Sequence, residues 1–274
     1  MRRRIEITGH GFLTDDIAKR LSERSAINPE VSTAVIATLN LANKLVLLLP
    51  IYSPSESVVD RQLTMALTLL VRLIEIAEST VILSAFEVRQ DVKTLLRVFL
   101  DAYFIFANVC NDPEFVAEYV RADEIARRKL INAAFNHDGR MFAKLKDYAT
   151  PELRAALDQR IKDDGIQEFQ SARYARQAGC VDIYDAHYRI LSASVHTTPR
   201  CFLDYLVTND SDEITAIRHD PDAENADQVL YDIAWFLLTA IENVSKHFSR
   251  SDFVEQIYVL RTNLSKMDGV KAEE

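Results

Sequence analysis

The residues best suited to chemistry lie together near residue 190, where Tyr188, Arg189, Ser192 and His196 follow one another within three helical turns. On a helix, Tyr188, Ser192 and His196 stand at i, i+4 and i+8, so these side chains can share one edge with Arg189. Histidine titrates near neutral pH and arginine stays charged, a combination that can move a proton beside a developing oxyanion or phosphorane. The stretch predicts an acid–base surface. An equally good interpretation is a histidine at the edge of the core that hydrogen-bonds a neighbouring helix.

A second candidate is the pair Arg97 and Asp101, which interrupts an otherwise apolar run from Leu95 to Phe104. The spacing of i and i+4 lets the two side chains form an ion pair on one side of a helix. A helix that is apolar nearly all round is a buried helix. Removing one partner of a buried ion pair strongly destabilises the protein. The pair therefore either fixes helix packing or belongs to a functional site.

A row of charges, Arg72, Glu75 and Glu78, follows one side of the preceding helical segment. Because charged side chains are rarely buried, we expect this row to face solvent.

Motifs for metals, nucleotides and nucleophilic hydrolases are missing from the sequence. It has no HExxH, no carboxylate–histidine motif of the di-iron type, no GxSxG and no Walker A sequence. Cys110, Cys180 and Cys201 show no CxxC spacing, which favours reduced thiols over a disulfide framework or a zinc site. We therefore expect no metal and no cofactor.

The elements that carry these residues are predicted to be helices throughout. The 274 residues include only six Gly and seven Pro, too few for the tight turns of a β-sandwich or for a phosphate-binding Rossmann or P-loop domain. Four prolines follow good N-cap residues, at Asn28, Ser53, Asp112 and Thr150, and Ser53 to Glu56 reads as a capping box. No strand alternation with hairpin turns is visible. The fold class is all-α, a helical bundle with long central antiparallel helices and shorter peripheral ones.

The expected helices cover residues 13–26, 30–49, 54–84, 87–110, 114–136, 140–148, 152–162, 166–177, 182–196, 223–249 and 252–266, with a short piece near 202. We expect one helical domain over 1–274, with a core of about 54–206 plus 223–266 and flexible segments at 209–222 and 268–274.

Charge and hydropathy limit the partners and the location. The net charge of −9 argues against a protein that coats nucleic acid, although a local basic site for RNA stays open. The apolar runs at 39–52 and 98–110 are too short for a membrane span, and the run at 63–86 carries charges. The N-terminal residues carry no apolar run of the secretory kind. We expect a cytoplasmic protein that does not bind membranes.

The chain resembles a bacterial family of all-helical domains of unknown function. The resemblance rests on Leu95 to Tyr103, on Asn111 to Glu114, and on Tyr188 to Ser192 with His196, and covers about residues 63–206. The family usually has Arg-x-x-x-Glu on its first helix, where this chain has Arg97 and the shorter Asp101. The resemblance implies a helical bundle in which Arg97, Asp101, Ser192 and His196 share a site.

A looser resemblance is to the HEPN helical domains, many of which are ribonucleases of toxin and antiphage systems that work without a metal. Their signature is Arg, four to six residues, then His, which Arg189 and His196 satisfy; Arg4 and His10 satisfy it too, and Ile190 replaces the polar residue that often follows the family's Arg. The resemblance implies that His196 acts as acid or base on a ribose 2′-hydroxyl, that Arg189 stabilises the phosphorane, and that two copies meet in a homodimer.

Two functions follow as hypotheses. The first is a HEPN-like ribonuclease of a toxin or antiphage defence module, with Arg97, Asp101, Tyr188, Arg189, Ser192 and His196 in its site. The alternative is a non-catalytic helical module that binds a protein partner or a small ligand, in which the same polar residues specify packing.

Overall fold

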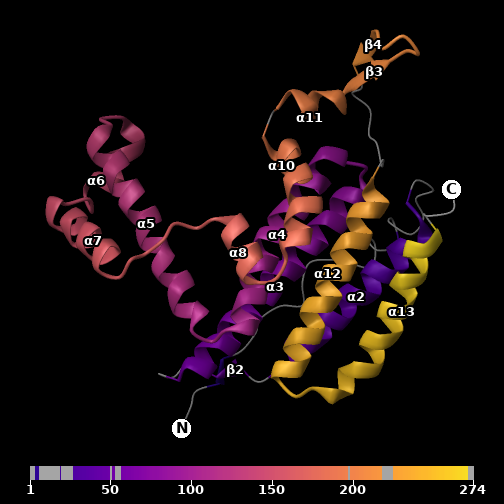
Figure 1. The fold of residues 1–274 in the computed structure, drawn as a ribbon, viewed down its shortest axis with the longest axis horizontal. Helices are drawn as coiled ribbons and strands as arrows, with labels where there is room; N and C mark the ends of the chain where they lie inside the picture. The colour runs from indigo at the N-terminus through magenta and orange to yellow at the C-terminus, as the bar shows by residue number, and fades with distance from the viewer. Residues whose placement is uncertain are drawn as a thin grey trace. The chain divides into compact units, whose positions relative to one another are not determined.

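The computed structural model describes residues 4–5, 19, 27–49, 51–52, 57–196, 198–217 and 225–270. The chain divides into two compact units, one formed by Met1–Asn111 with Ala172–Glu274 and the other by Asp112–Ser171. The described residues are mostly helical, which confirms the all-α prediction. Each unit is built around its own helices, drawn in Figure 1.

The first unit is a bundle of long helices (Figure 1). Its helices are α2 (Pro29–Leu48), α3 (Val58–Ala85), α4 (Arg89–Asn111), α12 (Ala226–His247) and α13 (Val254–Val270). Helices α3 and α4 pack along each other, and α12 contacts α2, α3, α4 and α13. The fully buried side chains include Leu39, Leu70, Phe99, Phe104, Phe106 and Phe253. Burial of these large apolar groups is the main favourable term that holds the bundle together.

Shorter elements follow α4 in the same unit and carry most of the predicted site. They are α8 (Ser171–Gln177), α9 (Val181–Ile183), the π-helix η2 (Tyr184–Tyr188), α10 (Arg189–Val195) and α11 (Pro199–Leu203). Helix α10 packs on α4. The side-chain amide of Asn108 on α4 donates to the backbone oxygen of Tyr174 on α8 at 2.8 Å, which fixes α8 to the core.

A β-hairpin follows α11, which corrects the expectation that the sequence contains none. Strands β3 (Leu206–Thr208) and β4 (Ile214–Ile217) pair antiparallel, with Leu206 opposite Ile217. The turn uses no glycine: the Asn209 side chain accepts from the backbone N–H groups of Ser211 and Glu213, and Asp212 adopts a positive φ. Strands of three and four residues, with the apolar side chains of β4 exposed, are too short to show alternation. Strands β1 (Arg4–Ile5) and β2 (Ile51–Tyr52) also pair antiparallel.

The predicted helix starts are confirmed at two of the four prolines. The Asn28 side chain accepts from the N–H of Glu30 at 2.8 Å, and the Thr150 hydroxyl accepts from the N–H of Leu153 at 3.1 Å. Asp112 accepts from the N–H of Glu114, but the next helix begins at Phe115. The capping box at Ser53 and all but one residue of the helix expected at 13–26 lie outside the described residues.

The second unit consists of α5 (Phe115–Asn136), the 3-10 turn η1 (Arg140–Phe142), α6 (Ala143–Lys146) and α7 (Pro151–Asp163). Helices α5 and α7 pack together and are linked by ion pairs such as Arg160 with Glu124 at 3.3 Å and Arg128 with Asp158 at 3.5 Å. Exposed ion pairs stabilise a fold only weakly. The helix predicted at 166–177 begins only at Ser171.

Helix α2 is the one helix among the described residues that is long and apolar enough to cross a membrane. The sequence prediction judged the apolar run too short because it began at Leu39, whereas the helix extends back to Pro29. Most of its most apolar stretch is buried inside the bundle, against α12, α3 and α13. A core helix of a bundle has this composition.

Candidate functional site

Arg97 and Asp101 form the ion pair that their spacing predicts. Nη1 of Arg97 lies 3.2 Å from Oδ2 of Asp101, and each side chain is 21% exposed. The guanidinium carbon of Arg97 also lies 4.8 Å from the ring centroid of Tyr188. Tyr188 is buried and packs against Phe104 of α4, with ring centroids 5.9 Å apart. The structure therefore brings Arg97, Asp101 and Tyr188 together where α4 contacts the end of η2.

Ser192 contacts this cluster through the backbone of Tyr188, whereas no hydrogen bond or ion pair within the described residues joins the His196 side chain to it. The Ser192 hydroxyl donates to the backbone oxygen of Tyr188 at 2.9 Å, within its own helix. Helix α10 ends at Val195, and His196 is its exposed C-cap with extended backbone dihedrals. In the described part of the chain, the imidazole of His196 makes no hydrogen bond or ion pair. The backbone N–H of His196 donates to the backbone oxygen of Ser192 at 3.3 Å, so the helical spacing of residues 188, 192 and 196 extends to the C-cap.

Arg189 points away from the cluster. Its guanidinium pairs with Asp185 at 2.8 Å and lies 5.5 Å from the ring centroid of Tyr184, and the side chain is largely exposed. Arg189 and His196 are thus both accessible at the surface, at opposite ends of α10.

The charged row on α3 is only partly exposed, which corrects one expectation. Arg72 and Glu75 face solvent and pair at 3.4 Å, as expected. Glu78 is buried, and its carboxylate accepts a hydrogen bond from the Asn43 side chain of α2 at 3.2 Å. An i+6 position has turned far enough round the helix to face α2 rather than water.

The sequence prediction missed His187, whose imidazole pairs with a buried carboxylate. Nδ1 of His187 lies 3.3 Å from Oδ2 of Asp232 on α12. The Asp232 side chain is only 8% exposed, and its other oxygen accepts from the Gln228 side chain at 2.8 Å. The hydrogen bond to Asp232 raises the pKa of the His187 imidazole, and partial burial offsets part of this rise. The pair holds the imidazole in one orientation, as carboxylates do for catalytic histidines.

The π-helix explains how neighbouring residues serve two different surfaces. Residues Tyr184–Tyr188 form one π-turn, a feature often found at functional sites. Within it, Tyr188 packs toward Arg97 and Phe104, while His187 reaches Asp232 and packs edge-on to Phe236 with ring centroids 6.1 Å apart. The wider turn changes the register that a regular helix would give.

His187 lines a cleft of about 310 Å³ between α4, α10, α11 and α12. The lining residues are Lys93, Leu96, Ala186, His187, Ile190, Leu191, Ala193, Arg200, Cys201, Asp204, Asn225, Gln228, Val229 and Asp232. Nζ of Lys93 lies 3.1 Å from Oδ2 of Asp204. Within the described residues, Nε2 of His187 and the exposed guanidinium of Arg200 make no hydrogen bond or ion pair. The volume suits a small molecule or one nucleotide unit.

The charge of the cleft differs from that of the whole protein. With His187 protonated, the cleft carries one net positive charge from Lys93, Arg200 and His187 against Asp204 and Asp232, and with His187 neutral these charges balance. The chain as a whole carries a net charge of −9. The guanidinium of Arg200, which makes no ion pair within the described residues, can bind an anion, and the oriented imidazole of His187 can transfer a proton to or from it. Among the described residues, no group of three or more His, Cys, Asp or Glu side chains is arranged to hold a metal ion.

One signal in the sequence could have identified this site. Asp232 interrupts the apolar helix from Val229 to Leu238 in the same way that Asp101 interrupts its helix, so it too is a candidate buried carboxylate. Asp232 is also the last member of an acidic segment that begins at Asp204, and it is overlooked when it is grouped with that segment. The pairing with His187 depends on the π-turn, for which the sequence carries no recognised signal.

Comparison with known proteins identifies a family but no activity. No curated protein and no solved structure matches the chain. Residues 63–214 match a family of unknown function, a match that covers more than half of the chain and extends from α3 to β4. His187, Arg200 and the Arg97–Asp101 pair lie inside the matched segment, and Asp232 lies outside it. The chain therefore belongs to the family of unknown function DUF5677.

Proposed function

We propose that this protein cleaves phosphodiesters in the cleft beside His187, with RNA as the substrate class that the HEPN resemblance implies. The observation that carries the proposal is the pair formed by His187 and the buried Asp232 in the wall of a cleft that also holds Arg200. The three cysteines are free thiols, which supports a role in the reducing cytoplasm. A toxin or antiphage defence module is the biological setting that the same resemblance implies.

His187 has the contacts that an acid–base group needs. Asp232 engages Nδ1, so Nε2 is left to exchange a proton with a ligand in the cleft. The hydrogen bond with Asp232 raises the pKa of His187, which makes its imidazole a stronger base than a free histidine side chain. Arg200 and Lys93 would hold the negative phosphate oxygens.

The reaction balances with these groups and an RNA substrate. Neutral His187 takes the proton of a ribose 2′-hydroxyl, and the 2′-oxygen forms a bond to phosphorus. The bond between phosphorus and the 5′-oxygen breaks, and the leaving oxygen takes a proton from water or from the histidinium. The products are a 2′,3′-cyclic phosphate end and a 5′-hydroxyl end. Arg200 would stabilise the charge on the pentacoordinate phosphorus.

A second version of the ribonuclease uses Arg189 and His196 at a homodimer interface. The observation in its favour is that both side chains are exposed on one short segment, where a second copy and an RNA strand could reach them. In this version Arg97, Asp101, Tyr188 and Ser192 support α10 from the inside.

The non-catalytic alternative is supported by the way the Arg97–Asp101 pair is engaged within the protein. Arg97 is held by Asp101 and by the Tyr188 ring, and neither Arg97 nor Asp101 lines the cleft beside His187. Such a pair specifies how α4 meets α10, and the cleft would then hold a small ligand or a side chain of a protein partner without turnover.

The test is cleavage of a fluorescent single-stranded RNA by the full chain, with and without a chelator. We expect His187→Ala to lower the rate by about 100-fold or more, because general acid–base catalysis contributes that much. His247→Ala, which removes an exposed histidine of α12 outside the cleft, is the matched control and should keep full activity. Activity that survives in His187→Ala but is lost in Arg189→Ala and His196→Ala would assign the reaction to the dimer version. If the wild-type protein binds nucleotides but does not cleave RNA, the ribonuclease proposal is wrong and the non-catalytic binding module is the remaining function.

A further inference from the structure

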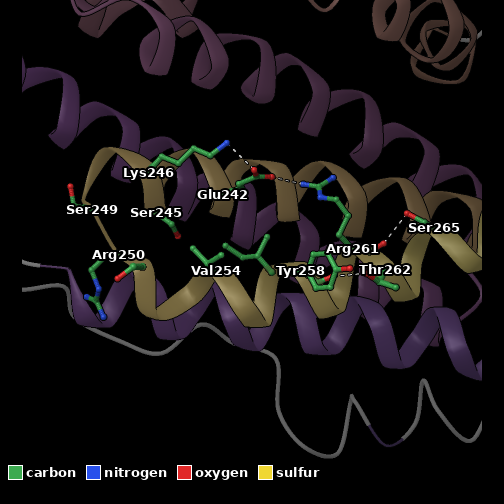
Figure 2. A pocket seen from close by; sticks show the side chains of 12 residues that line it. Glu242, Ser245, Lys246, Ser249, Arg250, Val254, Tyr258, Arg261, Thr262 and Ser265 are labelled. Carbon is green, nitrogen blue, oxygen red and sulfur yellow. Dashed lines mark hydrogen bonds and ion pairs between the residues drawn. The ribbon is translucent and has the colours of Figure 1, made fainter.

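A second and larger cavity lies in the first unit, outside the segment that matches the family. It is a groove of about 730 Å³ between α12, the 3-10 turn η3 (Ser251–Phe253) and α13. Figure 2 shows side chains of both helices converging on it, among them Ser245 and Lys246 from α12 and Val254, Tyr258 and Arg261 from α13. The volume falls within the range of small-molecule sites. The groove is separate from the cleft beside His187 and shares no lining residue with it.

The groove leaves large apolar side chains without cover in the described structure. Val254 and Tyr258 are both exposed although they line a concave surface, and Ile257 forms part of its wall. Apolar groups gain free energy when a ligand removes them from water. The wall therefore favours a ligand with an apolar body.

Ser245 supplies an independent sign of a missing partner. The residue is 4% exposed, lines the groove, and its hydroxyl has no hydrogen-bond partner among the described residues. Other helical hydroxyls in this protein donate to the carbonyl four residues earlier, as Ser192 and Ser265 do. A buried hydroxyl without a partner costs free energy, which a ligand oxygen in the groove would recover.

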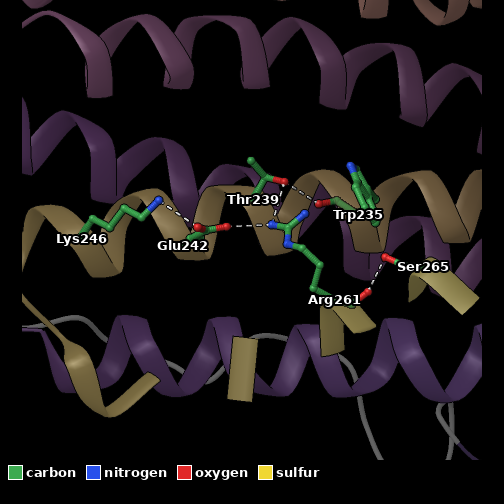
Figure 3. A network of polar contacts seen from close by, with 6 residues as sticks. All are labelled: Trp235, Thr239, Glu242, Lys246, Arg261 and Ser265. Carbon is green, nitrogen blue, oxygen red and sulfur yellow. Dashed lines mark hydrogen bonds and ion pairs between the residues drawn. The ribbon is translucent and has the colours of Figure 1, made fainter. Parts of the chain in front are cut away.

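The charges at the groove have a small positive excess. Figure 3 shows Glu242 between two cations: its carboxylate lies 2.8 Å from Nζ of Lys246 and 2.9 Å from Nη2 of Arg261. The hydrogen bond from Lys246 lowers the pKa of Glu242, so this carboxylate stays ionised. Arg250 is already paired with Asp252 at 2.6 Å. Two cations thus share one carboxylate, which leaves one positive charge for an anionic headgroup.

We propose that this groove binds a small amphipathic carboxylate, such as a medium-chain fatty acid. The chain would lie against Val254, Ile257 and Tyr258. The headgroup would lie near Lys246 and Arg261, and one of its oxygens would accept a hydrogen bond from the Ser245 hydroxyl. This site does not depend on the phosphodiesterase proposal, because it involves neither His187 nor its cleft.

The single tryptophan of the chain provides the readout. The guanidinium carbon of Arg261 lies 4.9 Å from the ring centroid of Trp235, so a headgroup that engages Arg261 changes the surroundings of the indole. The probe is dodecanoate below its micellar concentration, added to the full chain while Trp235 fluorescence is followed, with calorimetry as a second measurement. We expect a saturable change, weaker binding of dodecanol, and weakest binding of the cationic dodecyltrimethylammonium.

Two variants and a matched control test the groove itself. Val254→Phe fills it from an exposed position, and Val259→Phe adds the same bulk on the same helix outside it; the two valines are 61% and 50% exposed. Val254→Phe should weaken dodecanoate binding by at least about 10-fold, and Val259→Phe should leave it unchanged. Ser245→Ala should weaken the binding by about 3- to 10-fold, because one hydrogen bond is lost. Thermal melts confirm that each variant is folded.

Three results would overturn the proposal. They are the absence of saturable binding at millimolar dodecanoate, equal binding by the two phenylalanine variants, and equal binding of the cationic amphiphile. Sedimentation velocity could show instead that the wild type is a dimer, that Val254→Phe is a monomer, and that dodecanoate affects neither. This result would assign the groove to a second copy of the chain.

Discussion

The imidazole of His187 and the buried carboxylate of Asp232 lie 3.3 Å apart, one on the π-helix before α10 and the other on α12. The contact joins two segments of the bundle and orients a titratable side chain at the wall of a cleft. A buried carboxylate with a cationic partner is costly to leave unpaired, so the pair constrains both folding and protonation.

The pKa of His187 is expected to lie above 6.5 in the folded protein, because the protonated ring pairs with Asp232. Asp232→Asn keeps the size of the side chain but removes the charge, so the pKa of His187 should fall. A pH titration of the histidine Cε1–H signals by NMR measures both values. His137 and His247, which do not line the cleft, serve as internal controls. A His187 pKa unchanged by Asp232→Asn would contradict the pairing.

The same pair predicts how stability depends on pH. A histidine with a raised folded-state pKa contributes stability that is fully present below the unfolded pKa of 6.5 and is lost as the pH rises through the folded value. The free energy of unfolding of the wild type should therefore approach that of His187→Gln as the pH is raised from 6 to 9. Urea unfolding at several pH values measures the difference. If the difference in unfolding free energy between the wild type and His187→Gln grows as the pH rises, the predicted pH dependence is wrong.

Arg97→Ala should lower the free energy of unfolding by about 1–3 kcal/mol, because the change removes the ion pair with the half-buried Asp101. The loss also removes the contact of the guanidinium with the Tyr188 ring. Arg189→Ala is the control, since its exposed pair with Asp185 is worth at most about 1 kcal/mol. A double-mutant cycle with Asp101→Ala isolates the coupling between the two side chains of α4, and a coupling near zero would show that the ion pair does not stabilise the protein.

Asn108→Ala should destabilise the protein by about 1 kcal/mol, because it removes the buried hydrogen bond from the side-chain amide to the backbone oxygen of Tyr174, which keeps the N–H of Ala178 as a donor. Chemical denaturation measures the loss, and limited proteolysis should detect earlier cleavage near α8. Asn263→Ala, at an exposed position on α13, should change stability by no more than about 0.5 kcal/mol. Equal stabilities of the two variants would show that the amide does not anchor α8.

The sequence predicted the fold better than the site for a physical reason. Helices depend on local signals, and the cap at Thr150 and the apolar periodicity of α4 are local. The hairpin after α11 was missed because its strands are three and four residues long and its turn is built by side-chain bonds from Asn209.

The site depends on contacts between distant segments, which a single sequence does not reveal. The Arg97–Asp101 pair was predictable because both residues lie on one helix. The contact of His187 with Asp232 joins different helices and requires a π-turn. Spacing along one helix places Tyr188 and His196 on one edge, but it does not determine which other segments their side chains contact.

The most direct test of the account is an NMR titration of the histidine-labelled full chain with uridine 3′-monophosphate. The account predicts a saturable shift of the His187 signal and a further rise of its pKa, since a bound phosphate adds negative charge beside the ring. Arg200→Gln should weaken the response, and the His247 signal should stay fixed. A His187 signal that is unaffected at millimolar nucleotide, or one that responds no more than His247, would contradict the claim that this cleft binds phosphate esters.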